Sequence, residues 1–277
     1  MRYSTSRRSM VASGAVVGVC GLAGCLSGDR DVERTVTETY TADELTAIAV
    51  ETTIGDVAVE TASDGGIDIE GQKAAISRDD LEMVGLEATV DDGVLELSVD
   101  HDESRSLFGL RPDPVLDLSV AVPEELSVER VESGSGAVDA TDVVGDLTVI
   151  TETGDVTLAA VDGTVSVASE TGAITVSDPA SIDRLTNESG DVTASIPGLD
   201  GDATIETTTG AVELRLPDRL DLTLDLTTDT GEITVSDVAD LPEMAGDSLI
   251  EAVIGDGTHR LEVTTERGDV MVTGREQ

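Results

Sequence analysis

Carboxylates are the most abundant side chains in this chain that can do chemistry. The 277 residues include 58 Asp and Glu against 16 Lys and Arg. A glycosidase needs two carboxylates at a set separation, and so acidic a chain always offers pairs. Sugar sites also use aromatic faces, but Tyr40 and Phe108 are the only aromatic residues after the first 24, and the arginines are scattered singly. We therefore expect no catalytic activity, and a polysaccharide-acting β-helix enzyme stays an alternative.

The other reactive side chains form no recognisable constellation. His101 and His259 are far apart in the chain, and Ser133 lies in Ser-Gly-Ser-Gly rather than in the Gly-x-Ser-x-Gly motif of a nucleophilic serine. Carboxylates that follow glycines could ligate Ca²⁺, which prefers oxygen, at Asp56, Asp155, Asp191 and Asp269. The tandem glycine-aspartate nonapeptide of calcium β-rolls is absent, however. We predict no catalytic residue, metal or cofactor.

A repeated corner organises the chain. Eight times a Ser, Thr or Asn stands three residues before a glycine, and these glycines are Gly55, Gly136, Gly154, Gly172, Gly190, Gly210, Gly231 and Gly268. Four of them follow one another at steps of 18 residues. Apolar residues occupy positions −5, +2 and +4 relative to each glycine, with mostly polar residues between them. This period-two alternation on both sides of a turn predicts strand, turn, strand in each unit.

Units of constant period are expected to stack. Val156, Ile174 and Val192 would then lie above one another, and successive coils would pair through parallel strands. An antiparallel sandwich of repeated hairpins is the alternative, because short spaced strands also fit a sandwich. We predict an all-β, parallel β-solenoid (single-stranded β-helix), right-handed and with coils of about 18–21 residues, over residues 42–275.

Stacked coils would bring like charges together. Glu152, Glu170 and Glu188 would form one column, roughly 4.8 Å apart, in which neighbours repel by about 1 kcal/mol per pair even in water. The formal net charge is −42 and Lys73 is the one lysine, a composition typical of a halophilic archaeon. Molar salt shortens the Debye length to about 3 Å and makes such crowding tolerable. The charge argues against nucleic acid and anionic lipid head groups as partners of the folded body.

The N-terminus has the composition of an export signal. Ser6-Arg7-Arg8-Ser9-Met10-Val11 resembles the twin-arginine motif, with Arg7 and Arg8 as its arginines. The apolar stretch that follows is too short to span a bilayer, and Leu22-Ala23-Gly24-Cys25 resembles a lipoprotein box. We predict a signal peptide over residues 1–24, lipidation at Cys25, and a lipid-proximal tether over residues 25–41.

Two stretches interrupt the repeat, one between Gly55 and Gly136 and one between Gly231 and Gly268. The residues between Gly55 and Gly136 are expected to cap one end with divergent coils or a hairpin, and residues 101–114 to form a loop whose Leu107, Phe108 and Leu110 cover that end or dock a partner. Residues 240–248 are predicted to be an inserted loop or short helix. Asn187 begins the single Asn-x-Ser sequon, at a corner that we expect to face solvent, where it could accept a glycan.

Residues 45–275 resemble a family of β-strand-repeat proteins of unknown function that are labelled as proposed adhesins. The resemblance is carried by Val120-Ala121-Val122-Pro123, Ser133-Gly134-Ser135-Gly136-Ala137-Val138 and Thr151-Glu152-Thr153-Gly154-Asp155-Val156. It implies a single-stranded β-helix at the cell envelope, and it transfers no catalytic residue.

The sequence thus favours a lipid-anchored scaffold or adhesion protein on the extracellular face of the cytoplasmic membrane. The expected partners are the membrane, through the N-terminal lipid, and an envelope protein or a surface glycan, but not nucleic acid. Apart from a polysaccharide-acting enzyme, an envelope-sensing component bound to a membrane protein is the remaining alternative.

Overall fold

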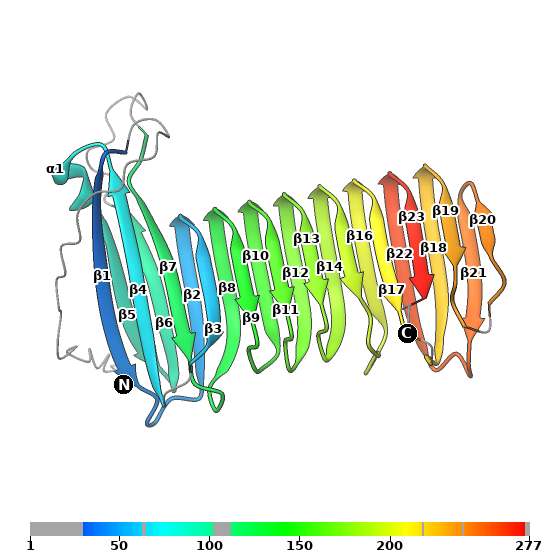
Figure 1. Ribbon diagram of the computed structural model, residues 1–277, viewed down its shortest axis with the longest axis horizontal. Coiled ribbons are helices and arrows are strands. Elements are labelled where there is room, and N and C mark those ends of the chain that lie inside the picture. Colours follow the sequence, from blue (N-terminus) through cyan, green and yellow to red (C-terminus); the bar gives the residue numbers. More distant parts are fainter. Residues whose placement is uncertain (1–29, 63–64, 102–111, 218, 240, 275–277) are drawn as a thin grey trace, which may run out of the picture.

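The computed structural model describes residues 30–62, 65–101, 112–217, 219–239 and 241–274. Two sheets lie face to face, and the strands of each sheet follow one another along one long axis (Figure 1). We call this stack of two sheets, which extends from Val32 to Gly274 in the sequence, the rack. Sheet A has twelve strands, in the order β1 (Val32–Thr41), β4 (Gly66–Ala75), β7 (Val115–Val122), β3 (Val57–Thr61), β9 (Val138–Thr141), β11 (Val156–Ala159), β13 (Ile174–Ser177), β15 (Val192–Ser195), β17 (Val212–Leu216), β23 (Val270–Gly274), β19 (Ile233–Ser236) and β20 (Met244–Gly246).

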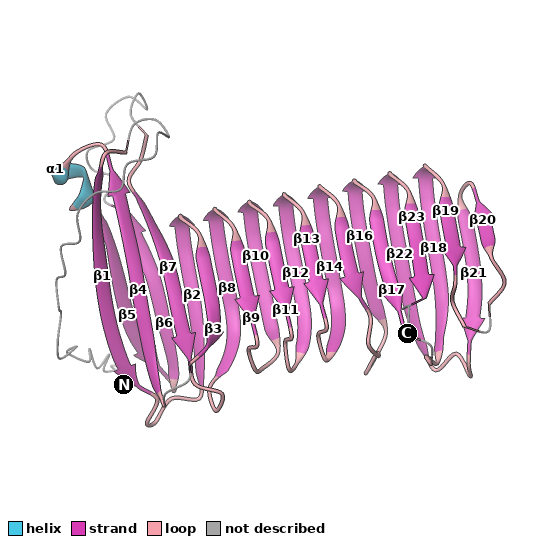
Figure 2. Ribbon diagram, viewed as in Figure 1, coloured by secondary structure: helices cyan, strands magenta, loops and turns pink. Residues whose placement is uncertain are grey.

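Sheet B has eleven strands and faces sheet A. Their order is β21 (Leu249–Ile254), β18 (Leu222–Thr230), β22 (His259–Arg267), β16 (Ala203–Thr209), β14 (Ser181–Ser189), β12 (Thr164–Thr171), β10 (Leu147–Thr153), β8 (Ser127–Ser135), β2 (Ala47–Ile54), β6 (Val94–His101) and β5 (Val84–Asp91). The helix α1 (Arg78–Leu81) is a single turn beside β4, and Figure 2 shows that the other regular elements are strands joined by loops and turns.

Each corner of the repeat joins a strand of sheet B to a strand of sheet A, and neighbouring corners stack in parallel. Val156 pairs with Ile174 and Ile174 with Val192, as the sequence predicts. Antiparallel pairs occur at the two ends of the rack, namely β1·β4, β4·β7, β5·β6, β18·β21 and β19·β20. The prediction of an all-β fold built from stacked parallel strands is therefore confirmed, and the alternative of repeated antiparallel hairpins is wrong.

Close stacking explains the glycine at each corner. Gly172 has φ +138°, and a Cβ built on it would lie 2.0 Å from the carbonyl oxygen of Gly154. A Cβ on Gly190 would meet the carbonyl oxygen of Gly172 in the same way, also at 2.0 Å. Each corner thus rests directly on the backbone of its neighbour, which only a residue without a side chain permits.

The order of the coils departs from the order of the chain at one end. The last coil, β22 with β23, lies between the coil of β16 and β17 and the coil of β18 and β19. After β17 the chain forms β18 and β19 two coil positions further along the axis, and then β20 and β21 at the end of the rack. The last two strands, β22 and β23, then occupy the position in between. The segment predicted as a loop or short helix over residues 240–248 instead contains the antiparallel strand β20, so the helix prediction is wrong.

The opposite end is closed by longer strands. The turn at Asp92 and Gly93 joins β5 and β6 into the expected antiparallel hairpin. The predicted tether is wrong over residues 32–41, because these residues form β1, which pairs along its whole length with β4. Residues such as Thr35, Val36 and Tyr40 favour strands. None of the ten residues of β1 is fully buried, so the strand lacks the apolar face by which strands are recognised.

The space between the sheets is filled by apolar side chains in continuous rows. Positions −5, +2 and +4 of the corners supply most of them, for example Val149, Val156 and Leu158, which are completely buried. A single cluster of buried residues runs from Ile48 to Val272. The core holds the two sheets at a fixed separation and leaves the polar positions facing outward, where the candidate site lies.

Candidate functional site

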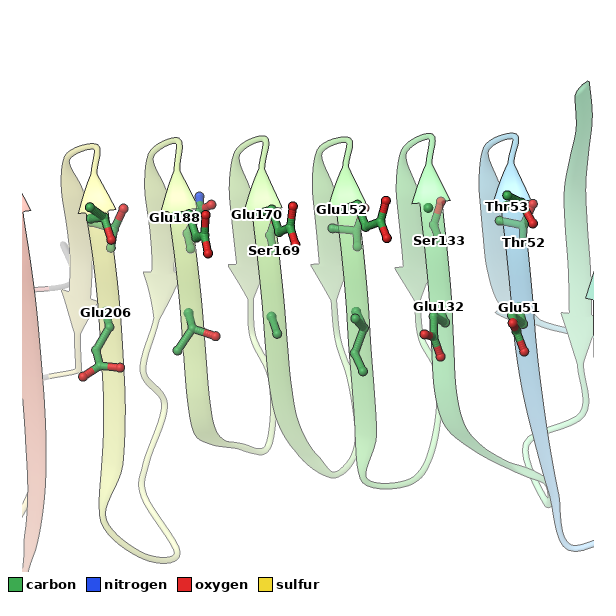
Figure 3. A pocket seen from close by; sticks show the side chains of 18 of the residues that line it. Glu51, Thr52, Thr53, Glu132, Ser133, Glu152, Ser169, Glu170, Glu188 and Glu206 are labelled. Atoms are coloured by element: carbon green, nitrogen blue, oxygen red, sulfur yellow. The ribbon is translucent and has the colours of Figure 1, made fainter. Parts of the chain in front are cut away.

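The outer face of sheet B carries a groove that runs across seven strands, β2, β8, β10, β12, β14, β16 and β22 (Figure 3). Its volume is about 720 Å³. Positions −4 and −2 of each corner line it, because they point away from the core. With strands about 4.8 Å apart, seven strands span roughly 29 Å along the axis of the rack. The groove is therefore an extended surface rather than an enclosed cavity.

Every one of these seven strands contributes one glutamate to the groove. Position −4 supplies Glu51, Glu132 and Glu206, and position −2 supplies Glu152, Glu170, Glu188 and Glu266. Where one position is acidic, the other is Thr, Ile, Ala or Gly, as in the pairs Ile150/Glu152 and Glu206/Thr208. The glutamates thus form one line across the strands, in which each strand places its carboxylate either in the row of positions −4 or in the row of positions −2. The line carries about one charge per 4.8 Å along the axis of the rack.

Cations pair with two of these glutamates, the ones on β8 and β16 that flank the three central strands of the groove. Arg130 pairs with Glu132, and Arg184 Nη1 lies 3.9 Å from Glu206 Oε2, both pairs being well exposed. In the part of the chain that the structure describes, Glu152, Glu170 and Glu188 have no ion-pair partner. They lie side by side on β10, β12 and β14 (Figure 3), which confirms the predicted column. The centre of the groove is therefore its most negative part.

A column of short polar side chains lies under the groove, at position −3. All eight are buried: Thr52, Ser133, Thr151, Ser169, Asn187, Thr207, Thr228 and Thr265. The expectation that Asn187 faces solvent at its corner is therefore wrong. Position −3 is in phase with the apolar position −5, so its side chain must point inward on a regular strand. The glycine carbonyl of the neighbouring corner gives it a hydrogen-bond acceptor there.

Half of this column is hydrogen-bonded and half is not. Thr228 Oγ1 donates to Gly268 O at 2.9 Å, Thr265 Oγ1 to Gly210 O at 3.1 Å, and Thr207 Oγ1 to Gly190 O at 3.3 Å. Asn187 Nδ2 donates to Gly172 O at 2.7 Å. Among the described residues, the hydroxyls without a hydrogen-bond partner include those of Thr52, Ser133, Thr151 and Ser169.

This difference predicts opposite effects for the same substitution. Thr151→Val replaces an unpartnered buried hydroxyl by a methyl group of similar shape, and it should raise the free energy of unfolding by about 1 kcal/mol. Thr228→Val removes a hydrogen bond, and it should lower the free energy of unfolding by about 1–2 kcal/mol. Denaturant unfolding of both variants followed by circular dichroism measures the difference. Equal changes in the two variants would show that the column is uniform.

The aspartates that follow the corner glycines link neighbouring corners. Asp56 Oδ1 accepts from the amide of Ala137, Asp155 Oδ1 from Ala173 and Asp191 Oδ1 from Ala211, each at 2.8 Å. Asp269 Oδ1 accepts from Glu232 at 2.9 Å. Acidic and alanine residues alternate along most of this row, which keeps those aspartates about 10 Å apart, or two strand spacings. These carboxylates thus have a structural partner without Ca²⁺, and the described residues contain no cluster of three or more His, Cys, Asp or Glu arranged to hold a metal ion.

A family model described as Toastrack DUF4097 matches residues 26–273. The chain belongs to this family. Membership fits the resemblance to adhesin-like β-repeat proteins that the corner motifs indicate. No curated protein matches this Toastrack chain.

Solved structures that resemble the Toastrack chain share little sequence with it. A proposed cell adhesion protein from Clostridium sporogenes is 11% identical, with 88% of this chain and 100% of that chain covered and a TM-score of 0.43. A proposed adhesin from Bacteroides fragilis is 14% identical, with 87% and 97% covered and a TM-score of 0.39. A proposed lipid-binding protein from Parabacteroides distasonis is 12% identical, with 90% and 99% covered and a TM-score of 0.40.

Asn187 is placed differently from the expectation. Its side chain is 4% exposed, its amide nitrogen donates to Gly172 O, and its amide oxygen accepts from Ser189 N at 3.2 Å. A glycan on Nδ2 would have to displace this hydrogen bond and open the corner. In the folded Toastrack chain, Asn187 acts as one more member of the buried column rather than as a solvent-facing acceptor.

The remaining predicted residues lie apart from the groove or outside the described ranges. His101 Nε2 lies 3.1 Å from Pro114 O at the β6 end of the rack, and His259 is on β22. Arg7, Arg8 and Cys25, like Leu107, Phe108 and Leu110, fall outside the described residues. Within those residues the Toastrack chain forms no helix with the length and apolar character needed to cross a membrane.

The groups with shifted pKa values lie not in the groove but at the end of the rack beyond β2, in the cap that β1, β4, β5, β6 and β7 form. Burial raises the pKa of the Tyr40 hydroxyl, and Glu38, which accepts its hydrogen bond at 2.5 Å, raises this pKa further. Burial lowers the pKa of Lys73, with Arg34 opposite it on β1 adding to the effect. Burial likewise raises the pKa of Asp117, although the hydrogen bond that its Oδ1 accepts from the amide of Asp56 acts to lower this pKa. Tyr40 and Glu38 share β1, Lys73 of β4 lies opposite Arg34 of β1, and Asp117 of β7 contacts the corner at Asp56, so each shifted pKa has a structural explanation.

Sequence reasoning identified only part of the groove. It followed position −2 through Glu152, Glu170 and Glu188, and it missed the glutamates at position −4. A signal was available, because positions −4 and −2 both alternate with the buried position −3 and must share the outer face. Considering the two positions together would have shown one acid for each strand.

Proposed function

We propose that this Toastrack protein is a lipid-anchored scaffold or adhesion protein of the cell surface, without catalytic activity. The observation that carries the proposal is the continuous outer face of sheet B, where each strand of the groove repeats the same polar pattern over an apolar core. An extended and repetitive surface suits contact with another extended molecule. An enzyme needs a local site in which a few different groups converge on one bond.

The position of the predicted anchor supports display away from the membrane. Cys25 precedes β1, which is the terminal strand of sheet A, at the opposite end from β20 and β21 (Figure 1). A lipid on Cys25 would therefore hold the rack by this end. The twelve strands of sheet A span roughly 53 Å, so the far end would project from the membrane if the rack stands upright.

The charge of the surface narrows the partners. A line of glutamates repels nucleic acid and anionic lipid, so the partner of the rack is an envelope protein or a surface glycan that tolerates or uses the acidic groove. The membrane itself is a partner only through the N-terminal lipid. In this proposal the protein works on the extracellular face of the cytoplasmic membrane of a halophilic archaeon, exported through the twin-arginine signal.

Cys25→Ser tests the anchor. The variant is expected to move from the membrane fraction to the soluble extracellular fraction, because without a thiol at this position no lipid is attached. Fractionation and immunoblotting of cells that express the variant or the wild type measure the change, with Cys20→Ser as the matched control that leaves the lipoprotein box intact. Unchanged membrane association of Cys25→Ser would defeat the lipoprotein part of the proposal.

Two further measurements test the scaffold role. A pull-down from native envelopes in molar salt should recover a defined envelope protein or glycan with the wild type, and less of it with the triple variant Glu152→Gln, Glu170→Gln and Glu188→Gln. Incubation of the purified protein with neutral and uronate polysaccharides should release no oligosaccharide. Measurable cleavage would overturn the proposal of a non-catalytic protein.

A further inference from the structure

The two sheets have four edge strands, and three of them carry features that discourage pairing with another chain. The strand β1 bears the charged residues Glu33, Arg34 and Glu38, and β5 bears Glu87 and Asp91. The strand β20 is only three residues long and is flanked by Glu243 and Asp247. Exposed charges and short edges are ways in which natural sheets avoid unwanted pairing.

The fourth edge strand, β21, lacks these features. Its sequence Leu249–Ile254 has one charged residue, Glu251, in a chain of net charge −42. Leu249 is 56% exposed and Val253 is 58% exposed, and among the described residues Met271 is the one other large hydrophobic side chain that is exposed. Within the described part of the chain, no strand pairs with the outer edge of β21.

We propose that β21 pairs with β21 of a second copy, so that two racks join tip to tip. Both β20 and β21 lie at this end, and each runs antiparallel to its neighbour, β19 or β18. A two-fold axis perpendicular to the sheets would therefore bring β21 against its own copy in antiparallel orientation, with the three-residue β20 of sheet A beside the junction. Such an interface is self-complementary, as two-fold dimers require.

The side chains favour one register. With Ala252 on the two-fold axis, Ile250 faces Ile254 of the partner copy on the core side, and Glu251 faces Val253 of the partner copy on the outer side. Moving the axis to Glu251 would place two acids directly opposite each other, which is unfavourable. The first register extends the buried rows of both racks across the junction, because Ile250 and Ile254 point into the core.

The distribution of charge also favours a second copy of the chain as the partner of β21. Two copies repel each other over most of their surfaces, since each carries a net charge of −42. An edge with one acid in six residues is where this repulsion is weakest and apolar area is available. Resting on the proposed anchor at Cys25, the tip-to-tip dimer would place its two lipids at opposite ends and connect two surfaces, as a self-adhesive protein does.

The test uses the full chain with Cys20→Ser and Cys25→Ser, which removes both native cysteines, in molar salt. Light scattering after size exclusion should give twice the monomer mass at high concentration. Val253→Glu places an acid opposite Glu251 of the partner copy at both ends of the pair, so it should weaken dimerisation by at least about tenfold. The matched control Met271→Glu, on β23 inside sheet A, should leave dimerisation unchanged. A monomeric parent chain at all concentrations, or equal effects of the two glutamates, would overturn the proposal.

A cross-link tests the register independently of the charge variants. Ala252→Cys should form an intermolecular disulfide under mild oxidation, because residues directly opposite in an antiparallel pair have Cα atoms about 4.5–5.5 Å apart, within disulfide range. Met271→Cys should not. Circular dichroism verifies that each variant is folded. Cross-linking at residue 271 to the same extent as at residue 252 would contradict the proposal. The dimer proposal and the anchor proposal are tested independently, because fractionation of the Cys25→Ser variant reports only on the lipid.

Discussion

Gly172→Ala is expected to lower the free energy of unfolding by more than about 3 kcal/mol, or to prevent folding altogether. The backbone at this corner has φ +138°, which residues with a side chain rarely adopt. The new Cβ would lie 2.0 Å from the carbonyl oxygen and 2.5 Å from the carbonyl carbon of Gly154. These atoms belong to the backbone of the next corner and cannot rotate away. Relief requires separating β10 and β11 from β12 and β13, which would break the stack at its centre.

Gly198→Ala is the matched control for this prediction. No heavy atom lies within 4 Å of a Cβ built on Gly198, which stands in the connection between β15 and β16. Its free energy of unfolding should change by less than about 0.5 kcal/mol. Thermal and denaturant unfolding in molar salt, followed by circular dichroism, compare the two variants with the wild type. Similar stability of both variants would mean that the corners are not close-packed.

The repeat made the stacked parallel strands predictable because it contains two independent signals. Period-two alternation indicated the strands, and glycine at constant phase indicated the corners. The error at Asn187 came from residue type. Asn187 is polar, and polar residues are usually exposed, although its phase at position −3 placed it on the inner face. Backbone carbonyls inside the corner, such as that of Gly172, make burial of a polar side chain possible, and a sequence pattern does not show them.

The order of the coils could not be predicted from the repeat. Every coil presents similar apolar rows to its neighbours, so the coil at Gly268 fits beside the coil at Gly210 as well as the coil at Gly231 would. Contacts of particular residues distinguish the two arrangements, such as the hydrogen bond of Arg267 with Thr209 and the ion pair of Arg260 with Asp225. The strand β1 was missed for a different reason. It caps an end and buries no full face, so its pattern resembles that of a polar tether.

The candidate groove could be predicted in part for the same reason. The column of three glutamates follows from the period, and positions −4 and −2 taken together give one acid for each corner. That these acids form one line across β2, β8, β16 and β22 depends on the order of the strands in sheet B. The aspartates after the corner glycines also needed the structure, because Asp155 shows its role only beside the amide of Ala173.

Removing salt is expected to loosen the rack, with the structure losing stability below about 0.5 M salt, where the Debye length exceeds roughly 4 Å. The effect should be concentrated at the centre of the groove, where Glu170 stands between Glu152 and Glu188. Each neighbouring pair repels by about 1 kcal/mol in water without screening. Glu170→Gln removes both repulsions, so it should raise the free energy of unfolding by up to about 2 kcal/mol in dilute buffer and by little in molar salt.

Glu206→Gln provides the matched control on the same face. Its neighbours in register are Thr186 and Thr264, and Arg184 lies within 3.9 Å of it. Its charge therefore faces a cation rather than acids at close range, and its removal should bring no gain in dilute buffer. Denaturant unfolding of the wild type and both variants across a series of KCl concentrations separates the two cases. If Glu170→Gln and Glu206→Gln responded equally to salt, the total charge rather than the central column would determine the salt dependence. If the wild type kept its full structure and stability in dilute buffer, the predicted salt dependence would be wrong.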